Sequence, residues 1–171
     1  MSKTDFHWVS RAEEVSELAK LFVANTDTSY ISHGEVIDGR ASDLGTWIPD
    51  LLGFMTREFG TALEPGKDGK QFKLACMTHE GTVAGLAFLT IETESGIAIL
   101  QDLVINSDLR GRRLGTLFLA WLEPRLREMG IRQLFLESGV QNESAYAFFH
   151  AQGFKTSSVV MNKPLTSDKP G

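Results

Sequence analysis

The stretch from Asp102 to Leu122 limits the fold of this chain more than any other. An apolar run, Leu103-Val104-Ile105, leads through a polar turn into a loop rich in Arg and Gly, at residues 110–116. Apolar residues then recur at helical spacing, at Leu114, Leu117, Phe118, Trp121, Leu122 and Leu126. The first turn of a helix has free backbone N–H groups and partial positive charge, so this strand, loop and helix predict an anion-binding site.

The loop fits neither standard nucleotide-binding pattern, because it lacks the P-loop sequence G-x-x-x-x-G-K-S/T and the dinucleotide sequence G-x-G-x-x-G. It resembles motif A of the GNAT superfamily of N-acetyltransferases, Q/R-x-x-G-x-G/A, in which backbone amides hold the pyrophosphate of acetyl-CoA. Arg110 and Gly115 match the outer positions of that motif. Arg113 stands where the motif prefers its first Gly, so close approach of the backbone there has to be compatible with a side chain.

A second match lies downstream, from Asn142 to Phe154. It resembles the family's motif B, N-x-x-A-x-x-F/L-Y-x-x-x-G-F, a helix that ends at a Gly and leads into a strand. Asn142 suits a helix N-cap and Gly153 suits a helix end. With the strand-like run Gln133–Glu137 between the two motifs, the chain resembles the GNAT superfamily from about Thr82 to Leu165.

The resemblance implies an α/β fold of the mixed α+β kind, with a central mixed, mostly antiparallel sheet flanked by helices. Two central strands splay apart in such a sheet, and the thioester end of the cofactor lies in the gap. A chain of 171 residues that is 42% hydrophobic has enough material for one core. We therefore expect a single domain over 1–171, with acceptor-side elements in 1–70, the sheet and acetyl-CoA core in 71–165, and a frayed tail at 166–171.

Hydrophobic periodicity and turn residues predict the individual elements. Helices are expected at Arg11–Asn25 and Trp47–Phe59, in the amphipathic segment that begins at the end of motif A, and within motif B. Strands are expected at Phe6–Val9, Gln71–Thr78, Val83–Glu92, Ile97–Ile105, Gln133–Glu137 and Ser157–Asn162. The strand at Ser157–Asn162 is expected to complete the sheet.

The resemblance also implies which residues hold the co-substrate, acetyl-CoA. The backbone amides of Arg112 to Thr116 would bind the pyrophosphate, Val104 and Ile105 would pair with the pantetheine arm, and Asn142 would contact that arm. Arg110 and Arg113 would add positive charge near the phosphates. The expected cofactor-binding set is Leu103, Val104, Ile105, Arg110, Gly111, Arg112, Arg113, Leu114, Gly115, Thr116, Asn142 and Phe149.

The catalytic groups are less evident, because acetyl transfer needs a neutral amine, a polarised thioester carbonyl and a proton for the departing thiolate. Polyamine acetyltransferases of the superfamily, which resemble this strand, commonly carry a Glu base where this chain has Gln101, and Gln does not accept the proton. Asp102 is the next candidate, and it becomes available only if a β-bulge rotates it. The family's Tyr acid is replaced by Phe149, which leaves Tyr146, one helical turn earlier, as the candidate acid.

The acceptor side falls in an acidic segment, since residues 27–60 contain six acidic residues and two Arg. Tyr30, His33, Glu35 and Asp38, together with Gln101, are candidates to line an acceptor pocket, and a solvated polar loop is the alternative interpretation. We expect an N-acetyltransferase that transfers acetyl directly to a primary amine of a small molecule in a ternary complex. Because the Glu and the Tyr are missing, a non-catalytic acyl-CoA-binding or sensing module is the competing hypothesis.

Composition argues against several other classes. A formal charge of −5 argues against a general nucleic-acid binder. Cys76 is the single cysteine, which excludes an intramolecular disulfide, and no His pair has metal-ligand spacing with carboxylates, so no metal is expected. No run of 18 apolar residues and no signal-peptide pattern is present, so we expect a cytoplasmic protein without membrane contact. A homodimer stays open.

Overall fold

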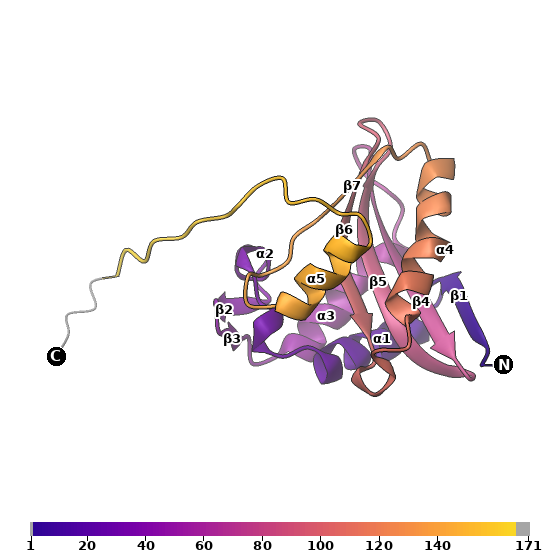
Figure 1. The fold of residues 1–171 in the computed structure, drawn as a ribbon, viewed down its shortest axis with the longest axis horizontal. Helices are drawn as coiled ribbons and strands as arrows, with labels where there is room; N and C mark the ends of the chain where they lie inside the picture. The colour runs from indigo at the N-terminus through magenta and orange to yellow at the C-terminus, as the bar shows by residue number, and fades with distance from the viewer. Residues whose placement is uncertain (1, 167–171) are drawn as a thin grey trace.

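The computed structural model describes residues 2–166, which form a five-stranded sheet with helices on both faces (Figure 1). The strand order is β1-β4-β5-β6-β7, and only the β6–β7 pair is parallel. The strands are β1 (Thr4–Trp8), β4 (Lys70–His79), β5 (Thr82–Glu92), β6 (Ile97–Ile105) and β7 (Gln133–Leu136). The predicted mixed, mostly antiparallel sheet is confirmed.

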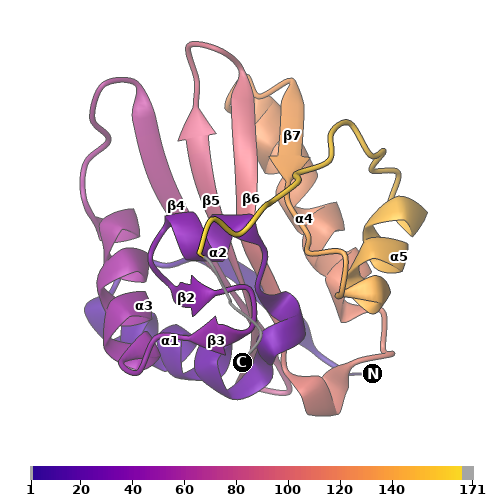
Figure 2. The same cartoon turned by 90° about the vertical axis from the view of Figure 1, so that its left-hand side faces the viewer.

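The helices divide between the two faces of the sheet. α1 (Ala12–Asn25) and α3 (Leu51–Gly60) bury Phe22, Met55 and Phe59 on one face, whereas α4 (Leu114–Glu128) buries Phe118 and Leu122 on the other. The short α2 (His33–Ile37) and the hairpin of β2 (Ala41–Asp43) and β3 (Thr46–Trp47) lie on the same face of the sheet as α1 and α3, and α5 (Glu143–Ala151) lies beyond β7 (Figure 2). Single turns of 3-10 helix occur at Thr28–Tyr30, Thr61–Leu63 and Ser107–Leu109. Within residues 2–166, no helix has the length and apolar character needed to cross a membrane.

The sheet opens between β6 and β7. Their parallel pairing runs from Ile97 with Gln133 to Leu100 with Leu136, and β6 then continues to Ile105 without pairing to β7. At the same point the β5–β6 register shifts, because Phe88 pairs with Asp102 and Leu89 pairs with Leu100. Gln101 is therefore the extra residue of a β-bulge at the point where the strands diverge.

The bulge exchanges the two faces of β6. Before it, Ala98 and Leu100 pack in the core beneath α4, whereas after it Val104 packs in the core beneath α1 and α3. A regular strand would keep these even-numbered residues on one face. Asp102 is consequently turned inward among the N-terminal elements, where 1% of its surface is exposed.

Two predicted elements differ from the structure. The helix expected at Trp47–Phe59 begins at Leu51, because Trp47 pairs within the β2–β3 hairpin and Asp50 caps the helix by accepting a hydrogen bond from the Gly53 N–H. The strand expected at Ser157–Asn162 was wrong for the isolated chain, where these residues have no secondary structure and lead away from the domain (Figure 1). A strand needs a partner, and among residues 2–166 this segment pairs with no strand. Of the tail expected at 166–171, residues 167–171 lie outside the described residues.

Candidate active site

A loop and a helix N-terminus follow the open end of β6. Gly111 and Arg113 both have left-handed backbone conformations, with φ of 79° and 60°, and α4 begins at Leu114. Asn25, at the end of α1, anchors the loop because its side-chain oxygen accepts from the Ser107 N–H at 2.8 Å and its carbonyl accepts from the Arg110 guanidinium at 2.8 Å. The position predicted to hold an anion is thus tied to the first helix.

The first turn of α4 has free donors. Arg113 is the N-cap residue and its side chain makes no capping bond, while the first intrahelical bond runs from the Leu117 N–H to the Arg113 carbonyl at 3.1 Å. The N–H groups of residues 114–116 therefore have no intrahelical acceptor, and the side chains of Arg110, Arg112 and Arg113 are exposed beside them. This arrangement, which we call the cradle (residues 110–116), suits a pyrophosphate.

Gly115 has a packing role that the sequence did not reveal. A Cβ atom at this position would lie 3.0 Å from Cζ and 3.3 Å from Cε2 of Phe148, which belongs to α5. A glycine here therefore lets α5 approach the first turn of α4. The two sequence motifs meet in space through this contact.

Arg113 occupies a conformation that glycine adopts more easily, which explains why the family motif has Gly there. The left-handed conformation costs a non-glycine residue about 1–2 kcal/mol, and extra freedom of glycine in the unfolded chain offsets about 0.5–1 kcal/mol of that. We expect Arg113→Gly to raise the melting temperature by about 1–4 °C and to weaken CoA binding less than about fivefold. Scanning calorimetry gives the melting temperature and titration calorimetry gives the CoA affinity. Arg113→Val is the control, and it should lower the melting temperature.

The edge of β6 beyond the bulge faces the gap. Leu103, Val104 and Ile105 pair with β5 on one side and lack a β7 partner on the other. Their free backbone groups can pair with an extended ligand, as the sequence predicted for the pantetheine arm. Asn142 is the N-cap residue of α5, and its side chain makes no capping bond to the helix.

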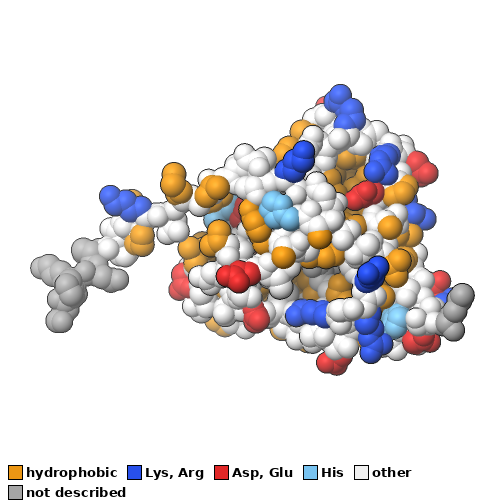
Figure 3. All heavy atoms as spheres, viewed as in Figure 1, with side chains coloured by type: hydrophobic (Ala, Val, Ile, Leu, Met, Phe, Trp, Pro, Cys, Tyr) orange, Lys and Arg blue, Asp and Glu red, His pale blue; other side chains and the backbone are white. Residues whose placement is uncertain are grey.

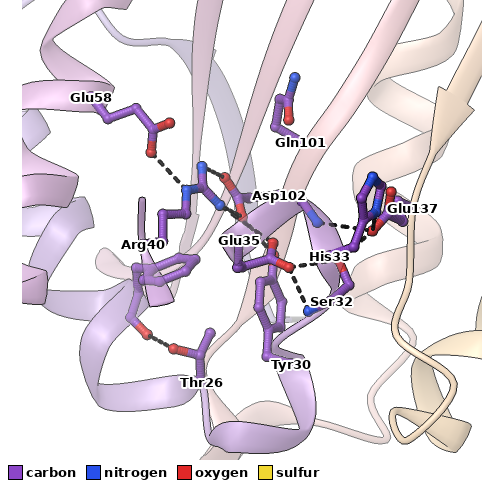
Figure 4. A network of polar contacts seen from close by, with 12 residues as sticks. Thr26, Tyr30, Ser32, His33, Glu35, Arg40, Glu58, Gln101, Asp102 and Glu137 are labelled. Carbon is purple, nitrogen blue, oxygen red and sulfur yellow. Dashed lines mark hydrogen bonds and ion pairs between the residues drawn. The ribbon is translucent and has the colours of Figure 1, made fainter. Parts of the chain in front are cut away.

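A buried ion network lies on the face of the sheet that α1 and α3 cover (Figure 4). Arg40, which is 2% exposed, donates to both oxygens of Asp102, at 2.9 Å and 2.8 Å, and its Nε donates to Glu58 at 2.8 Å. The Tyr30 hydroxyl donates to Asp102 at 2.6 Å, and Glu35 lies 3.7 Å from the Arg40 guanidinium. We call these five residues the Arg40 network.

Burial and the neighbouring charges together set the pKa values of Arg40, Tyr30 and Glu58. Burial by itself would lower the pKa of Arg40, but the negative charges of Asp102 and Glu58 outweigh it and raise that pKa. Burial raises the pKa of Tyr30 well above its usual value, and the adjacent Asp102 carboxylate adds to the shift. Burial also raises the pKa of Glu58, although Arg40 opposes the change. Arg40 therefore stays charged and Tyr30 stays neutral.

A second cluster joins α2 to the end of β7. One oxygen of Glu137 accepts from the Ser32 hydroxyl at 2.5 Å, from the Gly34 N–H at 3.1 Å, and contacts Nδ1 of His33 at 2.6 Å. Ser32 also donates its backbone N–H to Glu35 at 2.7 Å, and its hydroxyl oxygen lies 2.6 Å from the same carboxylate oxygen, which links this cluster to the Arg40 network. Burial by itself would raise the pKa of Glu137, but the hydrogen bonds from Ser32, His33 and Gly34 outweigh it and lower that pKa.

This second cluster opens into a groove of about 1200 Å³ that lies between α2, β7, α5 and the C-terminal segment. Phe149 and Tyr146 of α5 line the groove together with His33 and Glu137. The Tyr146 hydroxyl is hydrogen-bonded to Thr156, and the Tyr146 ring lies 4.6 Å from the His150 ring. Within residues 2–166, no group of three His, Cys, Asp or Glu side chains has the arrangement of a metal site.

The structure places the sequence-predicted acceptor residues in four settings. Tyr30 and Glu35 join Asp102 in the Arg40 network, and His33 pairs with Glu137. The amide of Gln101 donates to the Thr90 hydroxyl at 3.0 Å, and Asp38 is an exposed residue at the end of α2.

Sequence reasoning missed four residues of the site: Ser32, Arg40, Glu58 and Glu137. Ser32 and Glu35 carry a local signal, because they are three residues apart and form a capping box. Arg40 and Asp102 are 62 residues apart in the sequence, and hydrophobic periodicity does not predict that they pair.

Comparisons with known proteins identify the family. Residues 50–154 match the sequence profile of the Acetyltransferase (GNAT) family. An N-acetyltransferase called YycN, from Bacillus subtilis strain 168, is 29% identical over 125 residues, which are 71% of this chain and 80% of that protein. A protein named IAA acetyltransferase, from Azospirillum brasilense, is 32% identical over 76 residues, so the match spans 44% of this chain and half of that protein.

Solved structures show the same fold. The crystal structure of YycN from Bacillus subtilis has a TM-score of 0.62 at 24% identity, and the match covers 95% of this chain and all of that one. The aminoglycoside N-acetyltransferase AAC(6')-Iy, solved in complex with CoA, has a TM-score of 0.63 at 14% identity and covers 97% of both chains. The family match covers most of the chain and includes the cradle, the splayed strands and α5. The chain is an acyltransferase enzyme and belongs to the GNAT family of acetyltransferases.

Proposed function

We propose that this enzyme transfers the acetyl group of acetyl-CoA directly to a primary amine of a small molecule, within a ternary complex. One observation carries the proposal. The gap between β6 and β7 has the cradle at its entrance and the His33–Glu137 pair on its other side. A thioester that entered from the cradle would therefore meet an amine that entered from the groove.

Acetyl-CoA supplies the activated acyl group, and the chain has groups that fit its parts. The free N–H groups of residues 114–116 and the Arg side chains of the cradle would hold the pyrophosphate. The unpaired edge of residues 103–105 would hold the pantetheine arm, with Asn142 beside it. The CoA complex of AAC(6')-Iy, which has the same fold, supports this assignment.

We propose that His33 is the general base that accepts the proton of the amine. Its Nδ1 is engaged by Glu137, and among residues 2–166 its Nε2 has no hydrogen-bond partner, so Nε2 is free to accept a proton. Asp102 was the candidate from the sequence, and both of its oxygens already accept from Arg40. Asp102 then acts as a positioning residue that holds the bulge of β6 against Arg40 and Tyr30.

Two substitutions separate these roles. His33→Gln should lower kcat about a hundredfold or more with the melting temperature unchanged, because it removes a base from a partly exposed position. Asp102→Asn should lower the melting temperature, because a buried Arg40 loses its partner. Steady-state kinetics beside thermal unfolding decide the matter. If Asp102→Asn removes kcat from a stable protein and His33→Gln does not, Asp102 is the base.

Tyr146 is the proposed proton donor to the CoA thiolate, and Phe149 offers a way to test this side of the site. Phe149→Tyr places a second hydroxyl on the groove-facing side of α5, one turn from Tyr146. We expect the variant to keep kcat or to raise it, and Tyr146→Phe to lower kcat by about tenfold or more. A hundredfold fall for Phe149→Tyr in a normally folded protein would show that the position does not tolerate a hydroxyl.

The acceptor is proposed to be a small-molecule amine. The acidic residues of segment 27–60 are largely committed within the protein, because Glu35 and Glu58 face Arg40 while Asp27, Asp43 and Asp50 accept backbone N–H bonds. The acidic excess therefore offers a cationic acceptor less attraction than its count suggests. Glu137, which lines the groove beside His33, is the carboxylate best placed to attract one.

The experiment that tests the proposal varies both substrates. Intersecting initial-rate patterns, together with an unmodified enzyme mass after incubation with acetyl-CoA alone, are the expected result for direct transfer. Parallel patterns and an acetylated enzyme would contradict it. Tight CoA binding without turnover of any amine would instead favour the sensing module.

A further inference from the structure

One face of the sheet is only partly covered by helices. In Figure 2, α1, α2 and α3 lie over the lower part of this face, and the upper ends of β4, β5 and β6 extend beyond them. A row of paired residues crosses four strands there, because Phe72 pairs with Thr90, Thr90 with Ile99, and Ile99 with Phe135. Paired residues share a face of the sheet. Since Phe72 stacks on Phe88, which is in the core beneath α1 and α3, the row lies on the face that these helices cover in part.

The row is largely apolar, and it is open at its β7 end. Thr90 is 4% exposed, Phe72 and Ile99 are partly buried, and Phe135 is 41% exposed. Exposed apolar side chains also occur along the segment after α5, which leads away from the domain (Figure 3). Phe135 differs from those side chains because it belongs to a paired strand. The row therefore offers an apolar surface whose position is fixed by the sheet.

A charged pair lies next to the open end of the row. Glu137 comes two residues after Phe135, and side chains alternate along a strand, so both point to the same face. The contacts agree with this, since Glu137 accepts from the Gly34 N–H and contacts His33 at the start of α2. Phe135, Glu137 and His33 also line one groove. An apolar surface and a hydrogen-bonding pair therefore adjoin each other in that groove.

Gln101 adds a hydrogen-bond acceptor at the same level of β6. It comes two residues after Ile99, and its Nε2 donates to the Thr90 hydroxyl at 3.0 Å, so it lies on the same face as the row. This bond fixes the amide, because the NH2 group is directed at Thr90 and the oxygen is left as the acceptor. Among residues 2–166, no hydrogen-bond donor reaches that oxygen. Gln101 can therefore accept a hydrogen bond from an amino group beside it.

We propose that the acceptor is an amphipathic primary amine, with its amino group beside Gln101 and Glu137 and its apolar part on Ile99 and Phe135. The inference rests on the proposed acetyl transfer and names the chemical class of its acceptor. Two residues of a strand span about 6–7 Å, which suits an amine joined through two carbons to a ring or to a branched alkyl group. The amino group would then lie near His33, at the point where β6 and β7 diverge.

The apolar row also disfavours acceptors that are polar throughout. A polyamine or an amino sugar would place a second ammonium or several hydroxyl groups on Ile99 and Phe135, whose side chains form no hydrogen bonds. Loss of water from those groups without a new partner is unfavourable. An apolar group on the same surface gains from burial instead.

The first test compares amines that differ only in their apolar part. Initial rates would be measured at saturating acetyl-CoA with 2-phenylethylamine, 2-aminoethanol, 1,4-diaminobutane and the alkylamines from ethylamine to hexylamine. We expect kcat/KM to rise about two- to fourfold for each added methylene, and to be at least about tenfold higher for 2-phenylethylamine than for 2-aminoethanol. Equal values across the series, or a preference for 1,4-diaminobutane, would overturn the proposal.

The second test changes the row itself. Phe135→Ser should lower kcat/KM for 2-phenylethylamine about tenfold and change the value for 2-aminoethanol less than twofold. Phe135→Leu keeps an apolar side chain in the strand and should retain most of the preference. Leu52→Ser is the matched control, because Leu52 is also 41% exposed but lies on α3, and it should change neither value. If Phe135→Ser lowers the mass of the protein in solution and leaves the amine preference unchanged, the row is a contact between copies and the proposal fails.

Titration calorimetry separates this inference from the proposed reaction. The CoA-bound enzyme should bind 2-phenylethylamine more tightly than 2-aminoethanol, and Phe135→Ser should remove the difference. That binding preference without acetylation of any amine would support the acceptor surface and contradict the proposed acetyl transfer. Acetylation of polar and apolar amines with equal efficiency would support acetyl transfer and contradict the acceptor surface.

Discussion

Arg40→Ala should lower the melting temperature of the enzyme by roughly 6–20 °C. The substitution leaves Asp102, which is 1% exposed, without its two guanidinium hydrogen bonds, and leaves Glu58 without its partner. Removing one partner of a buried ion pair costs about 3–5 kcal/mol, and in a protein of this size each kcal/mol shifts the melting temperature by about 2–4 °C. Thermal unfolding followed by circular dichroism measures the change.

Two control variants separate charge from shape in this experiment. Arg40→Lys keeps the charge and loses the two-pronged contact with Asp102, so it should lie between the wild type and Arg40→Ala. The double variant Arg40→Met/Asp102→Leu removes both charges, and it should recover part of the stability that Arg40→Ala loses. A wild-type melting temperature for Arg40→Ala would contradict the network as described.

Gly115→Glu should weaken CoA binding at least about a hundredfold, which corresponds to about 2.8 kcal/mol. The side chain would place a negative charge at the helix N-terminus, where the cradle is expected to hold a pyrophosphate. It would also meet Phe148, because even a Cβ atom lies 3.0 Å from that ring. Isothermal titration with CoA gives the affinity.

Gly115→Gln is the matched control, because it has the same shape without the charge. Both variants disturb the contact with Phe148, so a difference between them reports the electrostatic part of CoA binding. We expect the glutamate variant to bind clearly more weakly than the glutamine variant, and the difference to shrink at high salt. Equal affinities would show that Gly115 matters for packing and not for the anion.

The sheet and the helices that pack on it could be predicted from local patterns. β5 and β6 are long apolar strands joined by a turn that contains Gly96 with a positive φ, and the predicted range of β6 agrees with the structure. The cradle was predictable because strand, glycine loop and amphipathic helix are consecutive in the chain. In both cases the information lies within about 20 residues.

The acceptor side depends on contacts that no local pattern contains. Arg40 meets Asp102 only because a bulge at Gln101 turns that carboxylate to the other face of the sheet. Glu137 meets His33 only because β7 diverges from β6 and ends near α2. Sequence periodicity assigns a face to a regular strand, so it predicts a bulge or a splay poorly.

The C-terminal strand illustrates a different limit. The composition of Ser157–Asn162 favours a strand, but a strand forms only beside a partner, and within residues 2–166 this segment pairs with no strand. Strand propensity does not identify the partner.

The most direct test of the proposed activity is amine-dependent release of the CoA thiol. Purified enzyme would be mixed with acetyl-CoA and a panel of small primary amines, with free thiol followed by a chromogenic disulfide and the product identified by mass spectrometry. The account predicts thiol release that requires both enzyme and amine, with one acetyl group gained by the amine for each thiol released. Thiol release at the same rate without any amine, or CoA binding with no acetylated amine across the panel, would contradict it.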